Sequence, residues 1–204
     1  MSDDPIIHVI DDDDSLRAAL ESLFGSVGLK CRGYASVADF LSKGHGDMGG
    51  CLVLDIRMPG MSGLDFQDQL DELGISLPVV LMSGHGDIPM SVRAMKAGAV
   101  DFLVKPFRDQ DMLDAVAAAV DRDRETRADA ADNAELQARY ARLSPRERQV
   151  MSLVSAGQLN KQVAFALTLS EVTVKIHRGA AMRKMGARTL PDLVRMQEKL
   201  ASAD

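Results

Sequence analysis

The sequence predicts an α/β protein in two parts, a doubly wound five-stranded parallel sheet followed by an all-helical domain of four helices. Within residues 1–120, five short β-rich runs alternate with helical patterns, whereas residues 142–204 show helical patterns alone. The charge also changes sign, from 9 Lys and Arg against 19 Asp and Glu in the first part to 11 against 5 in the second. Alternating strands and helices favour a parallel sheet covered on both faces, and right-handed crossovers restrict its topology.

The elements of the first domain follow from hydrophobic periodicity and from Gly and Pro stops. The strand-like runs are residues 6–10, 30–34, 51–55, 78–82 and 101–104. The helical patterns are residues 15–28, 36–43, 63–73 and 89–97, with a last helix opening at Arg108. We therefore expect a first domain at residues 1–120.

Residues 121–141 are rich in Ala, Asp and Arg and contain no Gly or Pro. Good helix propensity with a thin apolar stripe predicts a solvated helical linker. A dimerising coiled coil is the alternative, but Asp123 and Arg127 fall where its apolar seam should lie.

The second domain, residues 142–204, begins with SPRE (144–147), which has the Ser, Pro and Glu of a capped helix start. Gly157 ends that helix. Three more helices are predicted at residues 160–167, at residues 171–185 with Ser170 as cap, and from about residue 190. The basic charge of this domain favours nucleic acid as its partner.

Several classes of site and location are disfavoured by the sequence. No apolar run approaches the roughly 18 residues of a membrane helix, and the acidic N-terminus does not resemble a signal peptide, so we expect a cytoplasmic protein with no membrane partner. Cys31 and Cys51 form no C-x-x-C pair and predict buried, reduced thiols. The four histidines, His8, His45, His85 and His177, lack ligand spacing. The glycine-rich segment 44–49 precedes a strand, which favours a loop over a dinucleotide site.

Acidic and basic side chains end three of the predicted strands. Asp11 and Asp12 end the first, Asp55 the third, and Lys105 the fifth. These ends meet at one edge of a parallel sheet, where carboxylates repel one another unless a cation intervenes. Mg²⁺ takes oxygen ligands and leaves room for water and a phosphate. The pattern therefore indicates phosphoryl transfer to a carboxylate nucleophile.

Four segments resemble the receiver domain of response regulators. They are VIDD (9–12), LVLDIRMPGMSG (52–63), VVLMSGHGD (79–87) and AGAVDFLVKPF (97–107). The resemblance implies that Asp55 accepts a phosphoryl group from a sensor histidine kinase. It also implies that Asp12, Asp55 and the backbone carbonyl of Arg57 bind Mg²⁺ or Mn²⁺ directly, and that Asp11 binds it through water.

The same resemblance makes Ser83 the switch hydroxyl and Lys105 the phosphate-pairing lysine, with a cis bond before Pro106. Phe102 stands where many receivers have tyrosine, so coupling to Ser83 must run through packing. An aspartate-nucleophile phosphatase of the dehalogenase type is the nearest enzymatic rival. Its second Asp, two places after the nucleophile, is Arg57 here.

Residues 143–187 resemble the LuxR-type helix-turn-helix domain. The whole chain thus resembles a NarL/FixJ-type response regulator, nearest the FixJ-like branch. The resemblance makes residues 160–167 the scaffold helix and residues 171–185 the recognition helix. Thr168 departs from the pattern, because the turn between these helices usually has Gly, and Thr resists a left-handed conformation.

The recognition helix has two faces when read at 100° per residue. Val174, Ala181 and Met185 share the face that we assign to the core. The other face combines β-branched apolar residues with cations, which suits a major groove better than solvent. It comprises Val172, Lys175, Ile176, Gly179 and Arg183. Thr173, His177, Arg178 and Lys161 are candidates for phosphate contacts. Gly179 either lets DNA approach the backbone or is a neutral surface choice.

We therefore predict a phosphorylation-controlled transcription regulator with no enzymatic activity beyond self-phosphorylation and self-dephosphorylation at Asp55. Phosphorylation would favour a homodimer, formed through the fourth and fifth helices of the receiver, that binds promoter DNA; RNA polymerase is left open as a further partner. Two alternatives remain: a constitutive DNA binder whose receiver is only structural, and an enzyme that turns over phosphate compounds.

Overall fold

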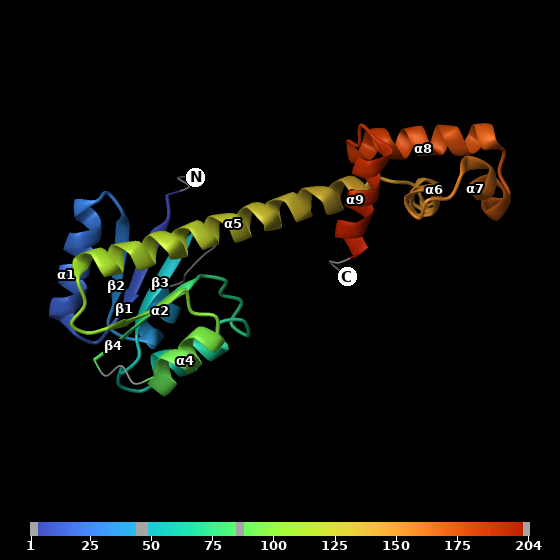
Figure 1. Ribbon diagram of the computed structural model, residues 1–204. Helices are drawn as coiled ribbons and strands as arrows, with labels where there is room; N and C mark the ends of the chain where they lie inside the picture. The colour runs from blue at the N-terminus through green and yellow to red at the C-terminus, as the bar shows by residue number, and fades with distance from the viewer. Residues whose placement is uncertain (1–3, 44–48, 85–87, 202–204) are drawn as a thin grey trace. The chain divides into compact units, whose positions relative to one another are not determined.

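The computed structural model describes residues 4–43, 49–84 and 88–201 and divides the chain into two compact units (Figure 1). The units are Met1–Arg127 and Ala128–Asp204. This division lies inside residues 121–141. The role of these residues as a linker stays a prediction. The segment 44–49 lies outside the described residues except for Gly49, and so do His45 and His85.

The first unit is a five-stranded parallel sheet with the strand order β2-β1-β3-β4-β5. Its strands are β1 (Ile6–Ile10), β2 (Lys30–Tyr34), β3 (Gly50–Asp55), β4 (Val79–Ser83) and β5 (Asp101–Val104). Four helices of this unit are α1 (Asp14–Ser26), α2 (Val37–Lys43), α3 (Gly63–Gln69) and α4 (Ile88–Lys96). The predicted doubly wound fold is confirmed. Helix α3 is shorter than predicted, because residues 70–74 form turns.

Both faces of the sheet are covered, and this explains the continuous apolar sequence of β3. Cys51 and Val53 belong to the core beneath α1 and α5 (Asp109–Ala141), whereas Leu52 and Leu54 belong to the core beneath α2, α3 and α4. Successive side chains of a strand point to opposite faces, so a strand covered on both sides needs an apolar residue at every position.

Helix α5 is a single helix of 33 residues that begins in the first unit and ends in the second. Its first part packs on the sheet, where Met112, Val116 and Ala119 are fully buried. Its last turns belong to the second unit, where Leu136 and Tyr140 pack against the core of that unit.

The second unit also contains α6 (Pro145–Ser155), α7 (Asn160–Leu167), α8 (Glu171–Met185) and α9 (Leu190–Ala201). The predicted capping box is present: the Glu147 backbone N–H donates to Ser144 Oγ, and the Ser144 N–H donates to Glu147 Oε2. Thr168 adopts a left-handed conformation with φ 56°, the only non-glycine among the described residues to do so. Its backbone N–H still bonds to Phe165 O, which closes α7.

Candidate metal centre and nucleic-acid interface

Three carboxylates gather at the carboxyl edge of the sheet. Asp11, Asp12 and Asp55 each offer an oxygen, and these oxygens lie within 4.8 Å of one another. Asp11 and Asp55 are buried, whereas Asp12 is exposed. The topology explains the cluster, because β1 and β3 are neighbours and both end there. One exposed and two buried carboxylates give the hard oxygen donors that suit a divalent ion such as Mg²⁺.

Lys105 balances part of this negative charge from the end of β5. Its Nζ donates to Asp11 Oδ2 at 2.7 Å and lies 3.0 Å from Asp55 Oδ1. The Lys105–Pro106 peptide bond is cis, as the resemblance implied. Burial lowers the pKa of Lys105, but the hydrogen bonds and negative charges of Asp11 and Asp55 together outweigh burial, and the net pKa is raised.

The electrostatics of Asp55 are set mainly by its burial. Desolvation raises the pKa of its carboxyl above the ordinary value, and the negative charges of Asp11 and Asp12 act in the same direction. The hydrogen bond and charge of Lys105 lower the pKa and offset only part of the rise. The charge of Lys105 therefore compensates only part of the negative charge of this cluster, and a bound divalent cation would compensate more of it.

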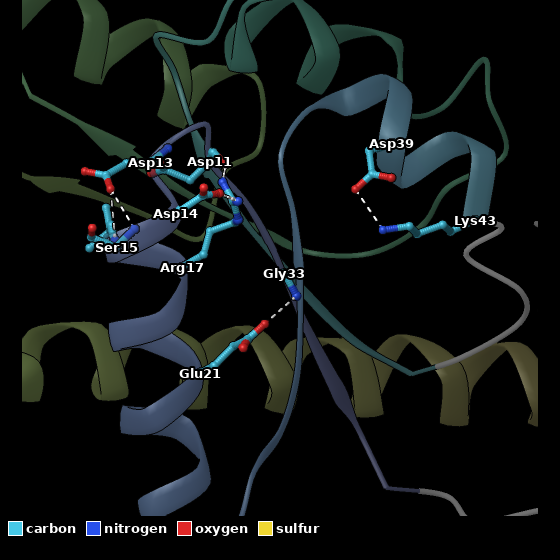
Figure 2. Close-up of polar contacts among 10 residues, drawn as sticks. Asp11, Asp13, Asp14, Ser15, Arg17, Glu21, Gly33, Asp39 and Lys43 are labelled. Atoms are coloured by element: carbon cyan, nitrogen blue, oxygen red, sulfur yellow. Dashed lines mark hydrogen bonds and ion pairs between the residues drawn. The ribbon is translucent and has the colours of Figure 1, made fainter.

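The start of α1 fixes the position of Asp11 (Figure 2). Asp13 caps the helix by accepting from the Ser15 and Leu16 N–H groups, and its own N–H donates to Asp11 Oδ1 at 2.8 Å. Arg17 donates to the Asp11 backbone carbonyl at 2.5 Å. Asp13 therefore serves as helix cap, and Asp14 is exposed and ion-paired with Arg17, as expected for a solvated first turn.

Gly63 allows the chain after Asp55 to fold back tightly. Its N–H donates to Ile56 O at 3.0 Å, and a Cβ at this position would collide with the Asp55 carbonyl oxygen. Arg57 is exposed in this loop. The role of its backbone carbonyl in metal binding stays a prediction.

Ser83 and Phe102 occupy the neighbouring strands. Ser83 is fully buried at the end of β4, and its Oγ donates to Met90 Sδ of α4 at 3.7 Å. Phe102, on β5, is partly buried and packs with Met90 against the same core. Met90 was not among the residues that the sequence singled out, and no local pattern marks it.

In the second unit, the recognition helix α8 has the two faces that the sequence predicts. Val174, Ala181 and Met185 are fully buried. Val172 and Ile176 are 67% and 63% exposed, a large apolar exposure next to the exposed side chains of Lys175 and Arg183.

The remaining candidates for DNA contact are less uniform. Lys161 is exposed, whereas Thr173, His177, Arg178 and Gly179 are half-buried. Thr173 Oγ1 is hydrogen-bonded to the cap Ser170 at 2.8 Å. Arg178 donates to Asn160 Oδ1 of α7 at 3.4 Å and thus helps to hold the two helices together. A Cβ at Gly179 would meet only the Arg183 side chain, at 3.6 Å, so packing does not require glycine there.

Two interactions fix α8 within its unit and were missed by sequence reasoning. Glu147 of the capping box also binds Lys184 of α8, with 2.6 Å between Oε2 and Nζ. Arg139 of α5 donates to the Met185 backbone carbonyl at 3.0 Å. The partners lie 37 and 46 residues apart, so no short motif could have indicated either contact.

Comparison with known proteins identifies both units. The family model "Response regulator receiver domain" matches residues 7–117, and the model "Bacterial regulatory proteins, luxR family" matches residues 141–197. The chain is 54% identical to nodulation protein W of Bradyrhizobium diazoefficiens, over 96% of this chain and 86% of that protein. It is 45% identical to the transcriptional regulatory protein FixJ of Azorhizobium caulinodans, over 93% of this chain and 90% of that protein.

A solved structure of similar length shows the same architecture. The response regulator StyR matches with a TM-score of 0.85 and 43% identity, over 96% of this chain and 99% of StyR. Among the residues described for this chain, no helix combines the length and apolar character that crossing a membrane requires.

Proposed function

The chain belongs to the response regulators that join a receiver domain to a luxR-type DNA-binding domain, and from this premise we propose that phosphorylation of Asp55 controls its binding to promoter DNA. One observation supports the assignment above all. Asp55 is a buried carboxylate that ends a central strand, 3.0 Å from Lys105 Nζ and within 4.8 Å of two further acids. This arrangement suits an oxygen nucleophile that receives a phosphoryl group.

In the proposed reaction, an Asp55 carboxylate oxygen forms a bond to phosphorus while the phosphorus–nitrogen bond of a kinase phosphohistidine breaks. The electron pair returns to the histidine nitrogen. Mg²⁺ or Mn²⁺ would be held by Asp11, Asp12, Asp55 and the Arg57 carbonyl. When bound, the ion neutralises phosphoryl charge. Lys105 would transfer its hydrogen bond from a carboxylate to a phosphoryl oxygen.

We propose that the kinase docks in an apolar groove beside this centre. The groove, of about 830 Å³, lies between α1 and the chain that follows β5. Leu16, Leu23 and Phe107 line it, and Asp13 and Lys105 stand at its border. Lys105 connects this groove to the phosphoacceptor, because its Nζ lies 3.0 Å from Asp55 Oδ1.

We propose that phosphorylated chains form a homodimer through α4 and β5. Ile88, Val92 and Met95 lie on one face of α4 and are 79%, 46% and 48% exposed, and Val104 of β5 is also exposed. Apolar side chains gathered on an exposed face favour a protein–protein contact. The receiver part of α5 instead directs its large apolar side chains into the core. The proposed surface therefore replaces the expected α4–α5 pair with α4–β5.

We propose that the dimer places two α8 helices in successive major grooves of promoter DNA, within the cytoplasm. Val172 and Ile176 would contact thymine methyl groups, and Lys175 a guanine edge. The proposed phosphate contacts come from Lys161, Thr173, His177 and Arg178, and Arg178 also holds α7 against α8. Arg183 lies on the groove face with Lys175. RNA polymerase is left open as a partner of the bound dimer.

Footprinting on promoter DNA tests this function. We expect an acyl-phosphate donor with Mg²⁺ to strengthen protection by the natural chain and to leave Asp55→Ala unchanged. Asp71→Ala removes an exposed acid outside the cluster and is the matched control, which should respond as the natural chain does. Equal protection by Asp55→Ala and the phosphorylated natural chain would instead establish the constitutive DNA binder. Multiple-turnover phosphate release would establish the enzyme.

The assignment of Lys175 has its own test. Lys175→Ala should weaken binding to the specific site by about 1–3 kcal/mol and binding to unrelated DNA much less. Equal losses on both DNAs would make Lys175 a phosphate contact.

A further inference from the structure

Among the residues that the structure describes, the hydroxyl of Ser83 contacts helix α4 through the side chain of Met90. Ser83 Oγ donates to Met90 Sδ at 3.7 Å, and this contact joins the buried end of β4 to the first turn of α4. A thioether sulfur is a weak acceptor, so the bond is one that a stronger acceptor can displace.

Helix α4 carries different groups on its two faces. Met90 and Ala94, four residues apart, face the core shared with Phe102. Ile88, Val92 and Met95 form the exposed apolar face on which the proposed dimer depends. A displacement of the first turn of α4 that moves the backbone of Met90 also moves Ile88 and Val92 on the opposite face, because these residues belong to the same helix.

The other end of α4 is tied to α3 by several polar contacts. Gln67 Nε2 donates to the Ala94 carbonyl at 3.3 Å and to the Ala97 carbonyl at 3.1 Å. Arg93 pairs with Asp65 at 3.2 Å and with Asp68 at 2.8 Å. With its last turns held by these contacts, α4 is adjustable chiefly at its first turn, where Met90 lies.

We infer that Met90 is the positioning residue that couples Ser83 to α4, and that its contact with Ser83 holds α4 in the conformation that disfavours the dimer. This inference rests on the proposed phosphorylation of Asp55. A phosphoryl oxygen is charged and accepts a hydrogen bond more strongly than sulfur does. Once phosphorylated, Asp55 draws the Ser83 hydroxyl away from Met90, and the first turn of α4 is released.

The same contact would couple the Ser83 hydroxyl to α4 although β5 has no tyrosine. Phe102 has no hydroxyl and packs with Met90 against a common core. A change in the packing of Met90 therefore acts on the core against which Phe102 also packs, and this core joins α4 to β5, the two elements that carry the exposed apolar side chains.

The test compares Met90→Leu in two backgrounds, the natural full-length chain and the chain with Ser83→Ala. Leucine keeps roughly the volume of methionine but removes the acceptor, so the fold should persist with a loss of stability below about 1.5 kcal/mol. Without phosphodonor, we expect Met90→Leu to strengthen dimerisation by about threefold to tenfold, the equivalent of one modest hydrogen bond. In the Ser83→Ala background the same substitution should have no effect, because the donor is already absent. Sedimentation equilibrium provides the dimer dissociation constants.

Met112→Leu is the matched control, since Met112 is a buried methionine in the core on the other side of the sheet. Its dimerisation should equal that of the natural chain. No change in Met90→Leu, or an equal change with and without Ser83, would overturn the inference. The natural chain measured with acetyl phosphate and Mg²⁺ provides the separate check on the proposed function: if it dimerises no better with the donor, phosphorylation control itself fails.

Discussion

The anchoring of α5 on the sheet yields a prediction whose magnitude can be worked out from the structure. Asp123 is 4% exposed, and its Oδ2 accepts the Gly50 backbone N–H at 2.8 Å. Both of its carboxylate oxygens lie 3.0 Å from Arg127 Nε. Gly50 has a φ of 140°, and a Cβ there would collide with the Ile6 carbonyl, so β3 begins with a glycine whose N–H depends on Asp123.

Asp123→Ala removes a charged acceptor and leaves a buried N–H without its partner, at a cost of about 1.5–3 kcal/mol. The Arg127 side chain is 39% exposed, so its ion pair adds less than about 1 kcal/mol. Alanine recovers about 0.5 kcal/mol through helix propensity. We therefore expect the free energy of unfolding of the first unit to fall by about 2–3 kcal/mol. Amide exchange at Gly50 and Cys51 should become about 30 to 150 times faster.

Hydrogen exchange with mass spectrometry on the full-length chain measures this effect, and urea denaturation provides the free energy. Asp121→Ala is the matched control, because Asp121 lies two residues before Asp123 on α5. Its carboxylate pairs with Arg124 at 3.2 Å on the exposed surface. It should change stability by no more than about 0.5 kcal/mol. Two variants of equal stability would refute the reasoning, since Asp123 would then contribute nothing beyond a surface ion pair.

Three further substitutions have predicted outcomes in the second unit. Lys184 and the Ser144 N–H lower the pKa of Glu147 below its ordinary 4.5, so the pair stabilises the fold above that pH and the stabilisation is lost as pH falls through the lowered value. Glu147→Gln should cost about 1 kcal/mol at pH 7 and remove this acid dependence, as pH-dependent thermal melts would show. Thr168→Gly should raise the free energy of unfolding by about 0.5–1 kcal/mol, because glycine adopts φ 56° without strain; an unchanged or lower midpoint contradicts this. Gly179→Ala should stabilise α8 by about 1 kcal/mol yet weaken specific DNA binding in a mobility-shift titration, and undiminished binding would mark Gly179 as a neutral surface choice.

Much of the fold could be predicted because its determinants are local. The range predicted for the helix at residues 171–185 matches α8. Its two ends are set by adjacent residues, Ser170 as N-cap and Gly186 as C-cap. The acidic centre was also predictable in outline, because Asp11, Asp55 and Lys105 end strands of a parallel sheet and must meet at one edge. The departure at Thr168 was visible in the sequence, and the structure shows that this residue adopts the strained conformation rather than avoiding it.

The end of α5 shows where sequence reasoning stops. Asp123 and Arg127 argued against an apolar coiled-coil seam, but nothing near them in the chain indicated that Asp123 binds Gly50, 73 residues away. Asp123, which interrupts the apolar stripe of α5, attaches this helix to the first residue of β3. The residues 128–141 belong with the helical unit for a similar reason, because Leu136 and Tyr140 bury their side chains in its core.

The sequence alone therefore determined the order of strands and helices, the two-part architecture and the set of carboxylates beside Lys105, because periodicity, caps and strand ends are properties of neighbouring residues. Only the tertiary structure decided that Ser83 bonds to Met90, Asp123 to Gly50 and Glu147 to Lys184, because each of these partners lies on another element. Hydrogen bonds act over about 3 Å in space with no regard to separation along the chain. The coupling proposed here, from Ser83 through Met90 to α4, is of that second kind.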